Sequence, residues 1–108
     1  MDLSHELKKY MYEKNKTWEE LQISDFINLS HSSINCLPLE ICKLKNLTYL
    51  DCSYNRLTYL PPEINRLHNL TMLNCSNNQL TYLPIEIGDL FNLTRIDCQS
   101  NYLTTLPS

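Results

Sequence analysis

The chain has 108 residues with a formal net charge of −3, and 43% of its residues are hydrophobic. This length fits a single domain, and the hydrophobic share is enough for a packed core, which excludes a globally disordered chain. The negative charge, with no stripe of basic residues, excludes an electrostatic surface for nucleic acid.

Residues 1–23 are predicted to form a helical N-terminal cap. Asp2 or Ser4 is suited to begin a first helix, because short polar side chains accept hydrogen bonds from the first turn. Thr17 and Glu20 have the spacing of a capping box, which predicts a second short helix. The apolar residues of the two helices are Leu3, Leu7, Tyr10, Met11, Trp18 and Leu21. We expect these helices to shield the first strand; the alternative is that they dock on a partner.

A 23-residue unit then repeats through residues 24–108 without insertion or deletion. The copies span 24–46, 47–69, 70–92 and, in part, 93–108. The second reads LTYLDCSYNRLTYLPPEINRLHN and the third LTMLNCSNNQLTYLPIEIGDLFN. The apolar alternation at the start of each copy predicts a short strand, and such strands stack in parallel to form a continuous core. The Pro and Glu that follow favour a helical or 3₁₀ turn.

This pattern, LxxLxLxxNxL followed by xxLPxEIxxLxNL, resembles the leucine-rich repeats of the 23-residue type. The resemblance implies an α/β repeat solenoid: a right-handed coil with a short parallel sheet on its concave face and 3₁₀ or helical turns on its convex side. It also implies a non-enzymatic protein-interaction module with a protein partner. The chain looks similar as well to short repeat proteins of large DNA viruses, for which the compartment would be the host cytoplasm.

Asn55, Asn78 and Asn101 recur at one position of the repeat, where the strand turns a corner. An Asn side chain has two donors and an acceptor, so we expect these residues to bridge neighbouring turns as a hydrogen-bonded ladder. The first copy has Ser32 at this position, which offers fewer bonds.

The outward-facing strand positions are the predicted binding face, because residues that do not pack are free to vary. One outward column holds Phe26, Tyr49, Met72 and Arg95. The next holds Asn28, Asp51, Asn74 and Asp97, and Tyr54 follows at the strand end. Aromatic residues, Met and Arg are enriched at interfaces, and Asp51 and Asp97 favour a partner with basic groups. The alternative is a merely solvated sheet face.

Size limits this face. Four strands span about 14 Å, and five residues of strand add about 17 Å. The resulting few hundred Å² is below the roughly 800 Å² per partner of a standard interface. A strong partner would therefore also contact the rims.

At the C-terminus the sequence stops within a repeat. We expect the last copy to present an uncovered edge, which favours a homodimer or larger assembly. The residues assigned to this self-association edge are Arg95, Ile96, Cys98, Leu103 and Leu106. A competing interpretation is that the chain is the regulatory fragment of a larger signalling protein.

The sequence predicts no catalytic residue, no metal site and no cofactor. Cys52, Cys75 and Cys98 share one repeat position, where a small apolar core residue is the simplest interpretation. The odd number of cysteines fits a reducing compartment. His5, His31 and His68 are predicted to be surface histidines, and one glycine cannot form a phosphate-binding loop. No apolar run reaches the roughly 20 residues of a membrane span, and no signal-peptide pattern opens the chain, so we expect an intracellular, cytoplasmic protein with no membrane partner.

Overall fold

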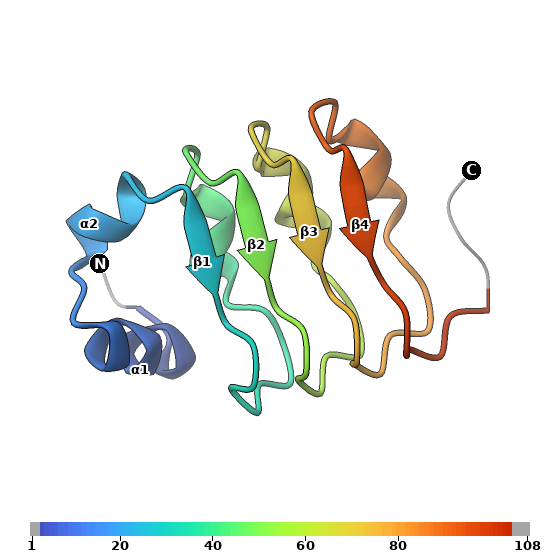
Figure 1. Ribbon diagram of the computed structural model, residues 1–108, viewed down its shortest axis with the longest axis horizontal. Coiled ribbons are helices and arrows are strands. Elements are labelled where there is room, and N and C mark those ends of the chain that lie inside the picture. Colours follow the sequence, from blue (N-terminus) through green and yellow to red (C-terminus); the bar gives the residue numbers. More distant parts are fainter. Residues whose placement is uncertain (1–2, 105–108) are drawn as a thin grey trace.

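The computed structural model describes residues 3–104 of the chain. Two helices come first, and four strands separated by three 3₁₀ helices follow (Figure 1). The α-helices are α1 (His5–Lys14) and α2 (Trp18–Gln22). The strands are β1 (Phe26–Asn28), β2 (Tyr49–Asp51), β3 (Met72–Asn74) and β4 (Arg95–Asp97). The 3₁₀ helices are η1 (Leu39–Lys43), η2 (Pro62–Arg66) and η3 (Ile85–Asp89).

The four strands form one parallel sheet in the order β1-β2-β3-β4. Their register follows the repeat: Tyr49 pairs with Phe26 on one side and with Met72 on the other. Each strand is therefore displaced from the next by 23 residues, as the uninterrupted period predicts. The prediction of stacked parallel strands is confirmed.

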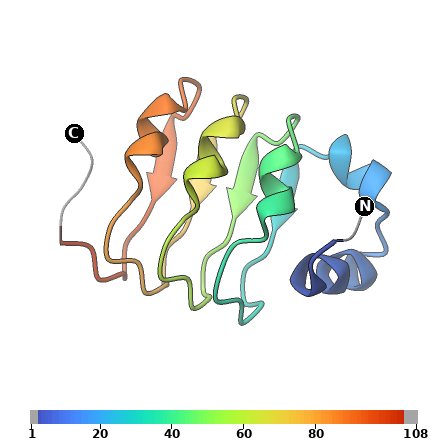
Figure 2. The same cartoon turned by 180° about the vertical axis from the view of Figure 1, so that it is seen from behind.

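The 3₁₀ helices form a second layer on the opposite side of the coil from the strands (Figure 2). A proline precedes each one, at Pro38, Pro61 and Pro84, where its fixed φ suits the entry into a helical turn. A glutamate lies in each first turn, where the positive end of the helix dipole favours a negative charge. The predicted 3₁₀ turns are confirmed.

The core lies between these two layers. Ile27, Leu50 and Leu73 line up across the sheet and are fully buried. Cys52 and Cys75 occupy the next inward position and are also fully buried, which confirms their interpretation as core residues. Burial raises the pKa of the Cys75 thiol to about 12 and that of Cys52 well above its usual range, so both stay protonated and unreactive at neutral pH.

The N-terminal helices begin as the sequence predicts. Ser4 is the residue that caps α1, and its side chain accepts from the Leu7 backbone N–H. The capping box of α2 is complete: the Glu20 N–H donates to the Thr17 hydroxyl (3.1 Å), and the Thr17 N–H donates to the Glu20 carboxylate (2.9 Å). The bond from the Thr17 backbone N–H to the carboxylate lowers the pKa of Glu20. The hydrogen bonds predicted at the starts of both helices are thus present.

Both helices lie beside β1 at one end of the sheet (Figure 1). Leu7 and Leu21 are fully buried in the same core as the strands. Burial raises the pKa of the Tyr10 hydroxyl, and a backbone hydrogen bond to Asn28 of β1 opposes part of that shift. The helices therefore contribute both apolar and polar contacts to the first repeat.

The predicted asparagine ladder is present. The Asn55 amide donates to the carbonyl oxygens of Leu29 (2.9 Å) and Cys52 (3.1 Å), and its oxygen accepts from the Ile34 N–H (3.2 Å). Asn78 repeats the arrangement one turn later, with its amide on the Cys52 carbonyl (3.0 Å). Each side chain thus ties two successive turns together and satisfies backbone groups that would otherwise be buried without partners.

Two further ladders arise from the phrase Asn-Leu-Thr at the repeat boundaries, and the sequence pattern alone did not indicate them. The Asn69 amide donates to the Lys45 carbonyl (2.8 Å), and the Thr71 hydroxyl donates to the Thr48 carbonyl (3.0 Å). The same bonds recur at the other boundaries, through Asn46, Asn92, Thr48 and Thr94.

Candidate functional site

The first outward column of the sheet is an aromatic row. Strand register places Phe26, Tyr49 and Met72 side by side, with Arg95 next on β4. The rings of Phe26 and Tyr49 lie 4.7 Å apart between centroids at an interplanar angle of 39°. Phe26 remains 44% exposed, so this pair presents apolar surface to solvent instead of burying it. Such surface on a strand is suited to a protein contact.

The second outward column is largely occupied by local hydrogen bonds. One side-chain oxygen of Asp51 accepts from both the backbone N–H (3.0 Å) and the hydroxyl (2.6 Å) of Ser53. Asn28 and Asn74 accept the same pair of bonds from the serine two residues further on. The column therefore stabilises the turn after each strand, and Asp51 offers a partner less free acceptor capacity than its charge suggests.

The fourth copy breaks this arrangement. It has Gln99 in place of the serine, and Asp97 instead accepts from the Arg95 guanidinium (Nε–Oδ1, 3.1 Å). The Arg95 side chain is 69% exposed, so solvent screens this ion pair and it contributes about 0–1 kcal/mol. Arg95 and Asp97, both predicted binding residues, are thus paired with each other on the face.

A third row lies at the strand ends, where Tyr54 stacks on His31. Their ring centroids are 4.5 Å apart and nearly parallel, at 14°. The 23-residue spacing predicts that His31 and Tyr54 share one outward repeat position, but the sequence indicates no stacking between their rings. Both residues have positive φ (56°), as do Asn77 (57°) and Ser100 (59°) at the same repeat position. Non-glycine residues thus make these turns.

The predicted self-association edge is less buried than its counterparts in the inner repeats. Ile96, Cys98 and Leu103 are partly buried, whereas the equivalent Leu73 and Cys75 are fully buried. Arg95 is exposed, and Leu106 lies outside the described residues.

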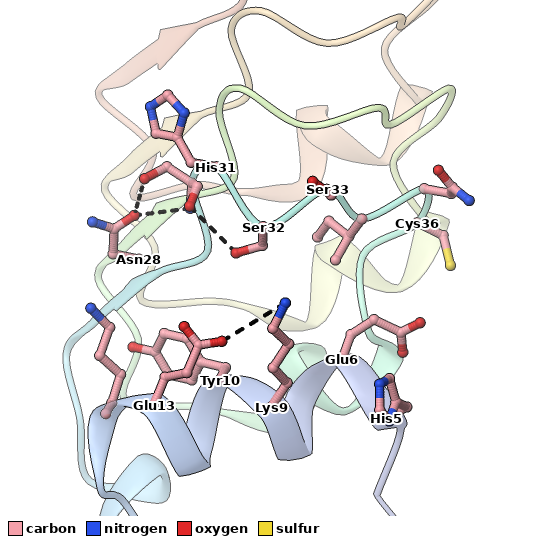
Figure 3. A pocket seen from close by; sticks show the side chains of 14 residues that line it. His5, Glu6, Lys9, Tyr10, Glu13, Asn28, His31, Ser32, Ser33 and Cys36 are labelled. Atoms are coloured by element: carbon pink, nitrogen blue, oxygen red, sulfur yellow. Dashed lines mark hydrogen bonds and ion pairs between the residues drawn. The ribbon is translucent and has the colours of Figure 1, made fainter.

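A cleft of about 610 Å³ separates α1 from the loop that follows β1, and the sequence did not predict it. Figure 3 shows the two walls: Glu6, Lys9 and Glu13 on the helix face the serine-rich segment that includes Ser32 and Ser33. The lining is mainly polar. Within residues 3–104, by contrast, no three His, Cys, Asp or Glu side chains gather as metal ligands.

The comparisons with known proteins agree with this geometry. Residues 45–87 match the family profile described as Leucine Rich repeats (2 copies). Among solved structures, 54 chains match, and one is a leucine-rich-repeat protein of Leptospira interrogans. It is 46% identical over 74% of this chain, with a TM-score of 0.72. No curated protein matches.

Residues 45–87 therefore match leucine-rich repeats, and the chain has the leucine-rich-repeat fold. It spans about 20% of the length of the Leptospira protein that it matches. The similarity to repeat proteins of large DNA viruses stays a prediction. In the described part of the chain, no helix is both long and apolar enough to cross a membrane.

Proposed function

We propose that the chain is a non-enzymatic protein-interaction module whose partner contacts the outward-facing strand residues. The contact surface consists of Phe26, Tyr49, Met72, Arg95, Asp51, Asn74, Asp97 and Tyr54. The observation that carries the proposal is the aromatic row, in which Phe26 and Tyr49 contact each other yet keep apolar surface exposed. The family supports it, because leucine-rich repeats generally mediate contacts between proteins. On the proposed domain organisation, residues 1–23 cap a solenoid formed by residues 24–108.

A pull-down from cell extract, quantified by mass spectrometry, tests this proposal. Tyr49→Ala and Arg95→Ala should each reduce capture of a specific partner, by roughly tenfold if Tyr49 is a central contact. Lys43→Ala is the matched control, since Lys43 is exposed in η1 on the opposite layer. A partner that Tyr49→Ala retains fully would contradict the use of this face.

Self-assembly is the second candidate. Its support is the partial burial of Ile96, Cys98 and Leu103 at positions that are fully buried in the inner repeats. Replacing Leu103 and Leu106 with charged residues distinguishes the two candidates. Loss of self-association with the partner retained favours the interaction module, and loss of both favours assembly. A clean monomer in light scattering at high protein concentration would remove the second candidate.

A third possibility is a regulatory segment of a larger signalling protein, which the limited coverage of the Leptospira relative favours. A longer reading frame around this segment would test it. For any of these roles we propose a reducing intracellular compartment, supported by Cys42, Cys52 and Cys75, which are buried and carry free thiols.

A further inference from the structure

The cleft between α1 and the first repeat adjoins the proposed contact surface. Asn28 and His31 line the cleft and also belong to the outward rows of the sheet. His31 connects the two directly, because its ring stacks on Tyr54. A partner seated on the strands would therefore reach the cleft without crossing another element, which addresses the small area of the sheet face.

The two walls of the cleft differ in chemistry. The loop wall has no Asp, Glu, Lys or Arg among its lining residues, and Ser33 and Asn35 offer a hydroxyl and an amide group. Such groups both donate and accept, so they match the alternating N–H and C=O groups of an extended peptide. The loop is also distinctive: Ser33 has a φ of 56°, whereas Arg56, its equivalent in the next repeat, is not among the positive-φ residues. Strained turns of this kind concentrate at binding sites.

The helix wall carries charges of both signs. Lys9 and Glu13 form an ion pair with each other (3.9 Å) in the middle of the wall (Figure 3). The wall has two further charged residues: Glu6 lies in the first turn of α1 and Lys14 in its last turn. Eight residues of helix separate these two charges by about 12 Å along the axis. An extended chain covers that distance in about four residues.

We propose that this cleft binds a short extended peptide segment that carries a basic and an acidic side chain about four residues apart. The basic side chain lies near Glu6 and the acidic one near Lys14. The segment belongs to the same partner that contacts the strands, so this inference rests on the proposed function.

Panning a phage-displayed library of random peptides against the full chain tests the proposal. We expect enriched peptides to share one basic and one acidic residue at about this spacing. Binding of a synthetic peptide from this set should weaken roughly threefold to tenfold in Glu6→Lys and in Lys14→Glu, because each change replaces an attraction with a repulsion at an exposed site. Asn35→Trp, which places a large side chain in the lining, should abolish binding.

The decisive arm is a charge exchange. The double variant Glu6→Lys/Lys14→Glu should bind poorly to the original peptide and should recover binding when the two charges of the peptide are exchanged as well. Glu19→Lys is the matched control, since Glu19 lies in the first turn of α2 but does not line the cleft. Thermal unfolding followed by circular dichroism verifies that each variant is folded.

A library without binders, or peptides that are indifferent to Glu6→Lys and Asn35→Trp, would overturn the proposal. If the selected peptides instead lose affinity in Tyr49→Ala alone, the cleft proposal fails while the strand surface stands. If the cleft variants alone lose affinity and the pull-down is unchanged by Tyr49→Ala, the strand surface fails instead.

Discussion

The two inner repeats, residues 47–69 and 70–92, are nearly interchangeable, whereas the first repeat, residues 24–46, departs from them on the side that faces the helices. Asn55 and Asn78 each bond a carbonyl of the preceding repeat. Ser32 has no preceding repeat to bond, and its hydroxyl reaches only the Ser30 carbonyl (3.4 Å). The comparison teaches that the 23-residue period predicts the hydrogen bonds of a residue that has a repeat on both sides. In the first repeat, contacts with the helices take the place of a preceding repeat.

The prediction with the largest expected effect concerns whether α1 and α2 cover the core of the first repeat as a neighbouring repeat would. Ile27→Ala and Leu73→Ala should each reduce the free energy of unfolding by about 2–5 kcal/mol, because both side chains are fully buried and leave a cavity. Urea unfolding followed by circular dichroism measures both. A much smaller cost for Ile27→Ala would mean that α1 and α2 do not cover the first repeat in solution.

The asparagine ladder gives the next contrast. Asn78→Leu should cost roughly 1–3 kcal/mol, because it orphans buried backbone groups of two successive turns. Ser32→Ala, at the same position of the first repeat, should stay within about 0.5 kcal/mol. Chemical denaturation of both variants checks the difference. A loss near zero for Asn78→Leu would contradict the ladder as a source of stability.

Alkaline pH should destabilise the fold through its buried thiols, which are Cys42 in the first repeat and Cys52 and Cys75 in the inner repeats. The pKa of Cys75 is raised from about 9 to about 12 by burial, so the unfolded chain loses this proton at a lower pH than the folded one. Its contribution is therefore complete below pH 9 and is lost as the pH rises toward 12. By pH 10 the loss is about 1.4 kcal/mol.

Unfolding measured at pH 7 and at pH 10 tests this expectation. The Cys75→Ala variant should lose about 1.4 kcal/mol less between the two conditions than the parent chain does. Its lower stability at neutral pH does not affect the comparison, since only the difference between the two pH values is read. Equal losses in both proteins would show that the Cys75 thiol does not titrate with unfolding.

The repeat period explains why so much of the fold was predictable from the sequence. Strand positions, register and the asparagine ladder all follow from spacing, and the Thr17–Glu20 box is a local signal. The hydrogen bonds within the second outward column were also within reach, since Asp51 and Ser53 have the two-residue spacing of an Asx turn. If the Asx turn is not recognised in the sequence, the Asp51 carboxylate is taken to be available to a partner.

The cleft was not predictable in the same way. Its walls come from α1, which lies outside the repeat, and from a loop whose conformation differs from that of the later copies. The 23-residue period contains no information about a contact between a segment outside the repeat and a loop that departs from it. The positive φ of Ser33 depends on how the chain passes from β1 to η1 beside the helix, and serine is not a residue that marks this conformation in a sequence.

The smallest expected effect is a change in the free energy of unfolding that has opposite signs in the first repeat and in the next one. Ser33→Gly should raise the free energy of unfolding by about 0.5–1 kcal/mol, because glycine adopts a φ of 56° without the steric cost that a side chain incurs, although it gains entropy in the unfolded chain. Arg56→Gly, the matched change in the next repeat, should lower it by a similar amount, since no such strain is relieved there. Thermal unfolding of the pair measures both signs. If both variants are destabilised alike, the first loop does not hold Ser33 in this strained conformation, and the distinctive wall of the cleft loses its structural basis.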